Sequence, residues 1–328
     1  MANTAGSVTL AVPEDMEGPV YVYYELTNFY QNHRKYVKSR DDDQLAAGNS
    51  VQRNADSYSS NCDPWYESSY ESGSGWTKKQ LYPCGLVGRS VFNDTFLVSY
   101  RDSKTSVFEN VIMDESPSTI SWSQDVEKKF NQANPALQTG ASILIEDVDM
   151  WILKTFPPQV CLPIKHSESP SYIPVATRTT SSGMSVVDCD FSQASPTCNF
   201  NPPCSGSSAP IFNPAGWGIS NAHFINWMRT AGLSTFRKLY GKIDKSFKKG
   251  DEFKLGIQSN FPVDTYSGTK KIVFSTTTWA GGRNSFLGIS YIVVGCLLLI
   301  FTAVYTALHL KRPRRLVDLD YLDWGESH

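Results

Sequence analysis

The chain has 328 residues, of which 41% are hydrophobic and 19% are charged, and its formal net charge is −2. This length allows one large domain or two ordinary ones, and the composition is compatible with a globular core. The balanced charge argues against a nucleic-acid-binding protein, because neutralising phosphates normally needs a broad excess of lysine and arginine.

The first predicted element is a strand at residues 19–26, where the side chains of Val20, Val22, Tyr24 and Leu26 alternate with tyrosine and glutamate. Asn28 then favours a capped short helix, in which Phe29, His33, Tyr36 and Val37 recur at helical spacing. His33 on this stripe is interpreted as a hydrogen-bonded packing residue rather than a general base.

Basic side chains are concentrated in the same stretch, at Arg34, Lys35, Lys38 and Arg40, and the acidic run 41–43 follows them directly. Aromatic rings interleaved with bases can bind single-stranded nucleic acid, and a basic amphipathic helix can lie on a membrane. We favour a structural segment whose rings fill a core. Its bases would then contact neighbouring acids, lipid headgroups or a protein partner.

Residues 46–75 are rich in Ser, Asn and Gly and predict a surface loop, and residues 156–214 predict a longer irregular insert rich in Pro and Ser. The β-branched and aromatic runs "SVFNDTFLVSY" and "SILIEDVDMWIL" between them predict strands. Asn93-Asp94-Thr95 is an acceptor sequence for N-glycosylation.

A helix is predicted from Ser220 onward, capped by Ser220 or Asn221, and Ser234 is expected to cap a second helical segment through Ile243. After it, "EFKLGIQSNFPV" and "TYSGTKKIVFSTTTW" predict two strands paired with each other through a Ser-Gly turn. These strands lead to Trp279, at the position expected of an interfacial aromatic anchor.

Residues 286–310 contain no Lys, Arg, Asp or Glu, and as a helix they would be about 37 Å long, enough to cross a hydrocarbon core of about 30 Å. This composition predicts a transmembrane helix. The basic residues that follow it predict a cytosolic C-terminus and an exoplasmic main domain; they are Lys311, Arg312, Arg314 and Arg315.

Most cysteines precede this helix, at Cys62, Cys84, Cys161, Cys189, Cys198 and Cys204, and Cys296 lies inside it. An even number in an exoplasmic domain favours disulfides, but six cysteines allow about fifteen pairings, so spacing does not give the connectivity. Residues 1–19 have no pattern typical of a signal peptide. We therefore expect a targeting span upstream of Met1, with the first transmembrane helix missing here.

The resulting division has an N-terminal segment at 1–18, an exoplasmic domain at 19–285 with the cysteine-rich insert at 156–214, a transmembrane helix at 286–310 and a cytosolic tail at 311–328. No motif predicts an enzyme, a metal site or a cofactor. The acidic clusters 41–43 and Glu146, Asp147 and Asp149 could supply an acid/base pair or cation ligands, but solvated turns and local ion pairs are the better interpretation.

Four segments together resemble one known family. They are "VYVYYELTNFYQNHRKYVKSRDD", "CG" followed by "FNDT", "FINWMRTAGLSTFRKLYGKI" and "FSTTTWAGGRNSFLGISYIVVG". The chain is similar to the cell division control protein fifty/ligand-effect modulator family, whose members are accessory β-subunits of the type-IV P-type ATPases that flip phospholipids. The resemblance covers residues 19–295 in the same order.

This resemblance implies a mainly β protein with short α-helices, in which an antiparallel β-sandwich forms the exoplasmic domain. It implies a non-catalytic subunit that forms a heterodimer with the ATPase among membrane lipids, and that the ATPase needs for folding, export from the endoplasmic reticulum and its transport cycle. The location would be the endoplasmic reticulum, Golgi, endosome or plasma membrane.

The resemblance also assigns residues. Cys62 and Cys84 match a family disulfide, and Asn93 matches a family glycosylation site. The cysteines of the insert have no counterpart and would form two local disulfides, with three possible pairings. The residues expected to contact the partner are Arg34, Lys35, Lys38, Trp279, Gly288 and Gly295.

Two other classes of protein remain as alternatives. One is a free-standing membrane glycoprotein that binds a glycan or another ligand, because a sandwich fold does not determine function. The other is an exoplasmic hydrolase that uses its acidic clusters.

Overall fold

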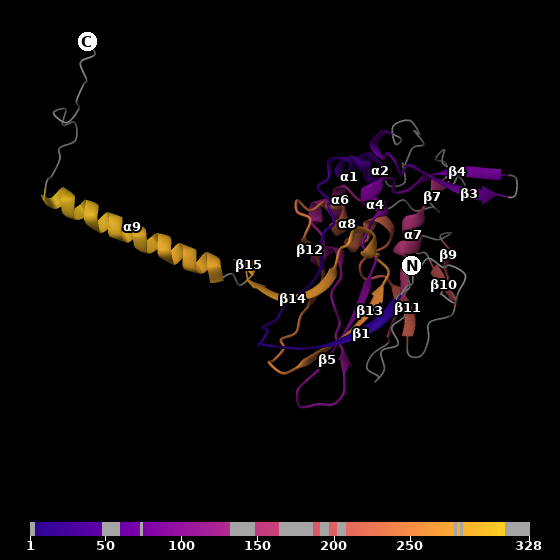
Figure 1. Cartoon of the computed structure of the whole chain (residues 1–328). Helices are drawn as coiled ribbons and strands as arrows, with labels where there is room; N and C mark the ends of the chain where they lie inside the picture. The colour runs from indigo at the N-terminus through magenta and orange to yellow at the C-terminus, as the bar shows by residue number, and fades with distance from the viewer. Residues whose placement is uncertain are drawn as a thin grey trace, which may run out of the picture. The chain divides into compact units, whose positions relative to one another are not determined.

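The computed structural model describes residues 4–47, 60–72, 75–131, 148–163, 186–190, 197–201, 208–278, 281–282 and 285–311. The chain divides into two compact units, Met1–Thr277 and Thr278–His328. The first unit holds the sheets and short helices, and the second holds the apolar C-terminal helix (Figure 1).

Two antiparallel sheets form the centre of the first unit. One has the strand order β1-β13-β5-β6, with bounds Thr4–Ala11, Glu252–Ser259, Thr95–Arg101 and Glu109–Asn110. In the other, β2 (Val20–Leu26) lies between β12 (Phe236–Ile243) and β14 (Lys270–Thr278). Strand β1 pairs with β13 along its whole length, so the segment before residue 19 forms part of the first sheet.

The two sheets share a hydrophobic core. Val22 and Ile243 of the second sheet are fully buried together with Val98 and Leu255 of the first. Each buried aliphatic side chain of this size stabilises the fold by about 1.5–3 kcal/mol relative to exposure. The predicted antiparallel β-sandwich with short helices is therefore confirmed.

Short helices gather at one end of the sheets (Figure 1). They are α1 (Arg34–Lys38), α2 (Asp42–Ala46), α4 (Leu86–Arg89), α5 (Pro117–Ile120), α6 (Ser123–Lys128), α7 (Trp151–Thr155), α8 (Ala222–Met228), η4 (Gly218–Ser220) and η5 (Asp264–Tyr266). Trp227 of α8 is fully buried beneath them, and its indole nitrogen donates to the carbonyl oxygen of Val87 at 2.8 Å. Phe29 packs against the Trp227 ring, with 5.6 Å between the ring centroids.

Smaller sheets lie outside the sandwich. Strand β4 (Gly75–Leu81) pairs antiparallel with β3 (Glu67–Ser72) and parallel with the two-residue β7 (Val148–Asp149). The insert contains two antiparallel pairs. Their strands are β8 (Gln159–Pro163) with β11 (Ser208–Phe212) and β9 (Val186–Asp190) with β10 (Thr197–Asn201).

The second unit contains β15 (Gly281–Gly282) and α9 (Ser285–Lys311). Residues Phe286–Lys311 of α9 are long and apolar enough to cross a membrane, and an 18-residue window within them has a mean hydropathy of 2.5. None of this window is buried inside the protein, as expected of a helix whose surroundings are lipid or another protein.

The structure corrects several predictions about local structure. Glu67–Ser72, within the predicted surface loop, form strand β3, and the last three residues of the run "SILIEDVDMWIL", predicted as strand, belong to helix α7. Residues 236–243, predicted to be helical, form strand β12 beside β2. Strands β13 and β14 are not paired with each other but belong to different sheets. Asn28 does not cap a helix: its φ is 59°, and its side-chain amide donates to the carbonyl oxygen of Tyr266 at 2.5 Å. The helix begins later, at Arg34.

Candidate interaction surface

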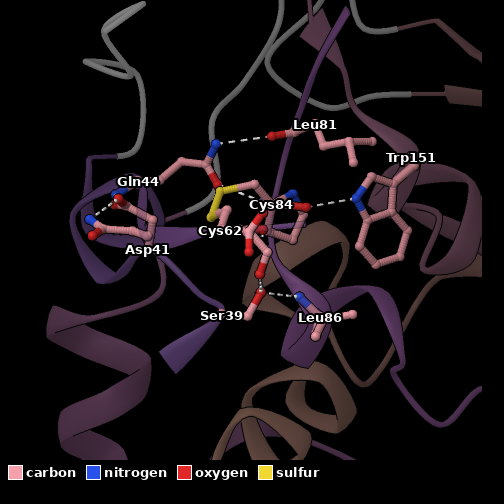
Figure 2. The surroundings of a disulfide bond; sticks show 11 residues. Ser39, Asp41, Gln44, Cys62, Leu81, Cys84, Leu86 and Trp151 are labelled. Atoms are coloured by element: carbon pink, nitrogen blue, oxygen red, sulfur yellow. Dashed lines mark hydrogen bonds between the residues drawn. A yellow bond between two sulfur atoms is a disulfide. The ribbon is translucent and has the colours of Figure 1, made fainter. Parts of the chain in front are cut away.

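A disulfide joins Cys62 and Cys84 beside the helices, with 5.6 Å between their Cα atoms (Figure 2). Both cysteines are buried. The pairing that the family resemblance implied is therefore confirmed. The bond links the loop that leads to β3 with the loop between β4 and α4.

Ser39 lies at the end of α1 and contacts both loops that the disulfide joins. Its hydroxyl donates to the carbonyl oxygen of Asp63 at 2.7 Å and accepts a hydrogen bond from the backbone N–H of Leu86 at 2.9 Å. Ser39 is 2% exposed, so these bonds satisfy a hydroxyl that has no access to water.

Asp41 and Gln44 hold helix α2 beside the disulfide. The Asp41 carboxylate accepts the backbone N–H of Gln44 at 2.7 Å and thereby caps the helix N-terminus. The buried Gln44 amide donates to the carbonyl oxygen of Leu81 at 3.0 Å and accepts the N–H of Cys84 at 2.9 Å (Figure 2). The Asp41-x-x-Gln44 spacing is that of a capping box, a signal that could have predicted this helix start.

The C-terminal end of α8 is held by two basic side chains. Arg40 donates to the carbonyl oxygen of Met228 at 2.9 Å. Lys238, buried in β12, donates to the carbonyl oxygens of Asn226 at 2.7 Å and Arg229 at 2.5 Å. Carbonyl groups at a helix C-terminus lack partners within the helix, and these side chains supply donors to them. Burial lowers the pKa of Lys238 to about 7. Sequence analysis did not predict this role for Lys238.

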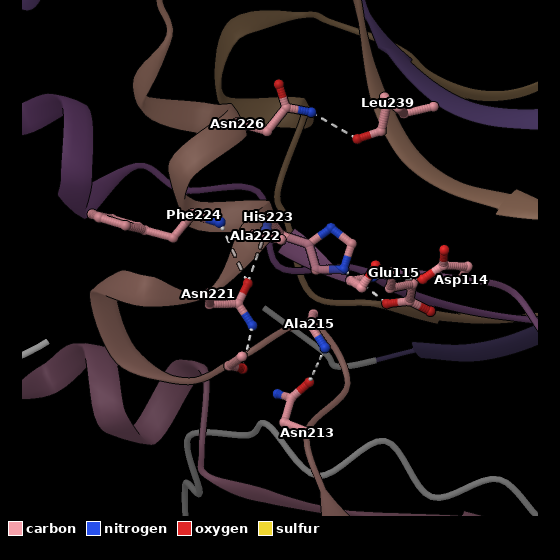
Figure 3. A network of polar contacts seen from close by, with 12 residues as sticks. Asp114, Glu115, Asn213, Ala215, Asn221, Ala222, His223, Phe224, Asn226 and Leu239 are labelled. Carbon is pink, nitrogen blue, oxygen red and sulfur yellow. Dashed lines mark hydrogen bonds and ion pairs between the residues drawn. The ribbon is translucent and has the colours of Figure 1, made fainter. Parts of the chain in front are cut away.

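The N-terminal end of α8 has a complementary arrangement (Figure 3). Asn221 caps the helix by accepting the N–H of His223 at 2.9 Å, so the predicted cap is confirmed. The ring of His223 lies 2.8 Å from the carboxylate of Glu115 and stacks on Tyr240 at 4.4 Å. The helix is therefore anchored at both ends by side chains.

Helix α1 differs from its surroundings because none of its residues is fully buried, although Tyr36 packs partly buried against the core. Arg34, Lys35 and Lys38 are exposed, and none of them forms an ion pair or hydrogen bond through its side chain with any described residue. Two exposed hydrophobic side chains occupy loops near this helix: Tyr30 is 57% exposed, and Leu233 is 73% exposed. We call these five residues the α1 surface.

The α1 surface has a rigid base. The hydroxyl groups of Tyr36 and Ser90 are hydrogen bonded at 2.7 Å, and burial raises the pKa of Tyr36 above its ordinary value. Asn32 donates to the carbonyl oxygen of Gly232 at 2.9 Å, which joins the loop of Tyr30 to the loop of Leu233. The cations are thus presented by backbone fixed at both ends.

Asn93 lies two residues before the start of β5 and is partly exposed. Its neighbour Asp94 is buried and accepts the backbone N–H groups of Asn260 and Phe261, each at 2.6 Å. Lys270 donates to the same carboxylate at 2.5 Å. The hydrogen bonds of Asp94 therefore hold the backbone beside Asn93, the predicted glycosylation acceptor, in place.

The remaining predicted site residues are scattered. Gly288 and Gly295 both lie in α9, whereas Trp279 and the acidic residues Glu146 and Asp147 fall outside the described residues. In the part of the chain that the structure describes, no three His, Cys, Asp or Glu side chains form a group suited to a metal ion. Asp41 is a helix cap, as its capping bond shows.

Comparison with known proteins decides the family. The family model described as the LEM3 (ligand-effect modulator 3) family / CDC50 family matches residues 1–315. The chain belongs to the LEM3/CDC50 family.

Several proteins of this family are similar along nearly the whole chain. Putative ALA-interacting subunit 4 of Arabidopsis thaliana is 34% identical over 97% of this chain and 70% of its own length. ALA-interacting subunit 3 of the same plant is 32% identical over 97% and 67% of the two chains. Human cell cycle control protein 50B is 31% identical over 92% and 69%.

Proposed function

We propose that this chain is the non-catalytic accessory subunit of a type-IV P-type ATPase that moves phospholipids between membrane leaflets. The observation that carries the proposal is the family match over residues 1–315, together with relatives whose names describe interacting subunits. In this role the ATPase performs the chemistry and the transport. The accessory chain assists its folding and its exit from the endoplasmic reticulum.

Helix α9 fits this role because it exposes apolar side chains around its whole circumference. Gly288 and Gly295 are separated by about two helical turns and therefore lie on similar sides of the helix. Small residues let two membrane helices approach closely. We assign this side of α9 to contact with a membrane helix of the ATPase.

The α1 surface is the second contact that we assign to the partner. Cations that form no ion pair with any described residue remain available to an acidic segment of another protein, and nearby exposed apolar side chains add contact area. The fixed backbone beneath them lowers the entropy lost on binding. Preferential binding to some transport states of the ATPase would then shift the populations of those states.

We place the β-sandwich on the exoplasmic side and the C-terminus in the cytosol. A disulfide is expected in an oxidising compartment, and Asn93 is partly exposed as a glycan acceptor must be. Treatment with an endoglycosidase should shift the mobility of the wild-type chain but not of Asn93→Gln. A C-terminal tag should be cleaved by protease added outside sealed microsomes.

Purification in mild detergent tests the main proposal. A tagged full chain should recover a P-type ATPase in stoichiometric amount, identified by mass spectrometry. Recovery of the folded glycoprotein without any ATPase would contradict the proposal and favour a free-standing ligand-binding protein. Hydrolase activity that disappears in Asp149→Asn, with folding retained, would favour an enzyme.

Charge reversal tests the α1 surface. The variant Arg34→Glu/Lys35→Glu/Lys38→Glu should recover at least tenfold less ATPase than wild type. The matched control reverses three exposed lysines in other loops. These are Lys104, Lys248 and Lys249, and their reversal should leave recovery unchanged. Equal recovery by both variants would remove the α1 surface from the interface.

Glycine replacement tests the α9 contact separately. Gly288→Leu/Gly295→Leu should lower ATPase recovery, whereas Val294→Leu, which adds one methylene to an exposed position of the same helix, should not. Equal recovery by all three chains would assign the glycines to contact with lipid.

A further inference from the structure

The cysteine-rich insert is built as two nested pairs of strands. At the base of the insert, strand β8 pairs with β11. Strands β9 and β10 lie between β8 and β11 in the sequence and pair with each other. The base is closed by backbone hydrogen bonds, from Asn213 to Pro158 and from Gly218 to Phe156, each at 2.8 Å. The insert therefore lies between α7 and α8 in the chain, with its two ends paired at the base; we call it the arm.

The register of the inner pair places two cysteines opposite each other. Cys189 of β9 faces Cys198 of β10, with Asp188 facing Asn199 on one side. Residues directly opposite on antiparallel strands have Cβ atoms about 4.5–5.5 Å apart. That spacing is near the 3.5–4.5 Å of a disulfide, so a small adjustment would permit the bond. Cys161, by contrast, faces Pro210 in the outer pair.

We propose that Cys189 and Cys198 form a disulfide across the β9–β10 hairpin. This reduces the three possible pairings of the insert cysteines to one. The inference rests on the exoplasmic location given under the proposed function, because a reducing compartment would keep both thiols reduced.

The oxidation is an ordinary exchange with a disulfide of the dithiol oxidoreductase class. The thiolate of one cysteine attacks the oxidant's disulfide and displaces one of its sulfurs, which forms a mixed disulfide. The second thiolate then attacks the sulfur of the first cysteine and releases the oxidant as a dithiol. Two electrons pass to the oxidant, and the two protons lost by the cysteines end on its two thiols.

A disulfide would stabilise the paired strands β9 and β10. A two-stranded hairpin is marginally stable by itself in water. Among the described strands, β9 and β10 pair only with each other. A covalent link between facing positions would restrict the unfolded arm and favour the paired one.

Peptide mapping of the full chain, purified from membranes under alkylating conditions, tests the proposal. Chymotrypsin cleaves after Phe191 and Phe200, which separates Cys189, Cys198 and Cys204 onto different peptides. Without reduction, mass spectrometry should find the peptides of Cys189 and Cys198 linked. A link from Cys189 to Cys161 or Cys204 would overturn the pairing.

Single variants give an independent readout. Cys189→Ser should expose one thiol to maleimide, at Cys198, and Cys198→Ser should expose one at Cys189. The double variant should expose neither. Free thiols at both positions, with Cys62 and Cys84 still linked, would overturn this inference alone. Reduced thiols at all four positions would overturn the exoplasmic location as well.

Discussion

Helices α1 and α2 have five residues each and follow one another in the chain, yet they have opposite relations to the rest of the fold. Helix α1 buries no residue and exposes cations. Helix α2 is capped by Asp41 and buries Gln44 and Leu45. Two helices of equal length, one basic and one acidic, thus serve different purposes, α1 as surface and α2 as part of the framework around a disulfide.

The comparison shows that a polar helix residue is buried where the fold supplies hydrogen-bonding partners for it. The polarity of the residue alone does not decide whether it is buried. Gln44 is inside because Leu81 and Cys84 offer it a carbonyl group and an N–H group. Lys35 is exposed, and no described residue pairs with its ammonium group. Substitutions on the framework side should therefore affect stability, and substitutions on the α1 surface should affect association.

Removal of the disulfide should have the largest effect. Cys62→Ala/Cys84→Ala opens a link between residues separated by 22 positions. It should lower the free energy of unfolding by about 3 kcal/mol, mainly because the unfolded chain gains freedom. Urea unfolding of the purified chain, followed by tryptophan fluorescence, measures this. A loss below about 1 kcal/mol would mean that the hydrogen bonds of the framework hold the two loops together without the disulfide.

Gln44→Ala should come next. It leaves the carbonyl group of Leu81 and the N–H of Cys84 buried without their partner, which should cost about 2 kcal/mol. The matched control is Lys35→Ala in α1, which should change the free energy of unfolding by less than about 0.5 kcal/mol. Equal effects of the two substitutions would break the comparison between the helices.

Acid should destabilise the helical end through Asp125. Burial disfavours its ionised form, but hydrogen bonds from Arg229 and Lys129 outweigh burial, so the pKa of Asp125 lies below its ordinary value of 3.8. A carboxyl group whose pKa falls on folding stabilises the protein above the unfolded pKa and loses that contribution as pH falls through the folded pKa. The free energy of unfolding should therefore decrease below about pH 4.

Two variants isolate this contribution in unfolding experiments across the acid range. Asp125→Asn should flatten the pH dependence because it removes the titrating group. Arg229→Met removes the main hydrogen-bond donor, so the folded pKa of Asp125 should rise toward the unfolded value and the loss of stability in acid should become smaller. An unchanged pH profile in Asp125→Asn would assign the acid sensitivity to other carboxylates.

Charge reversal on the α1 surface should affect stability least. Arg34→Glu/Lys35→Glu/Lys38→Glu should keep the free energy of unfolding within about 1.5 kcal/mol of wild type, because three exposed substitutions each change it by at most about 0.5 kcal/mol. Thermal unfolding of the purified chain tests this. A large loss would show that these cations belong to the framework, and the comparison of α1 with α2 would fail.

Some elements follow directly from local pattern. Strand β2 was predicted because its hydrophobic side chains alternate, and the structure pairs it on both sides. Asn221 was predicted as a helix cap from its place before an apolar segment. Helix α9 was predicted from its length without charge. Each signal lies within a few consecutive residues, which is why sequence reasoning finds it.

Strand β12 shows why other elements escape such reasoning. Phe236, Leu239, Tyr240 and Ile243 are spaced as on a helix, and Lys238 between them suggests a side chain in water. In the strand, Lys238 points inward, because the C-terminal end of α8 supplies carbonyl oxygens to its ammonium group. A buried lysine is tolerated here only because that helix end supplies hydrogen-bond acceptors. The spacing of hydrophobic residues in the sequence therefore predicts the wrong element at this place.

Sequence alone thus determined the family, the membrane helix, the alternating strand β2 and, through resemblance, the disulfide between Cys62 and Cys84. Tertiary structure decided which sheet β13 and β14 join and which polar residues face inward. The physical reason is the same for both. A strand's partners and a buried amide's partners come from residues far along the chain, as Leu81 and Cys84 do for Gln44, so no local pattern contains them.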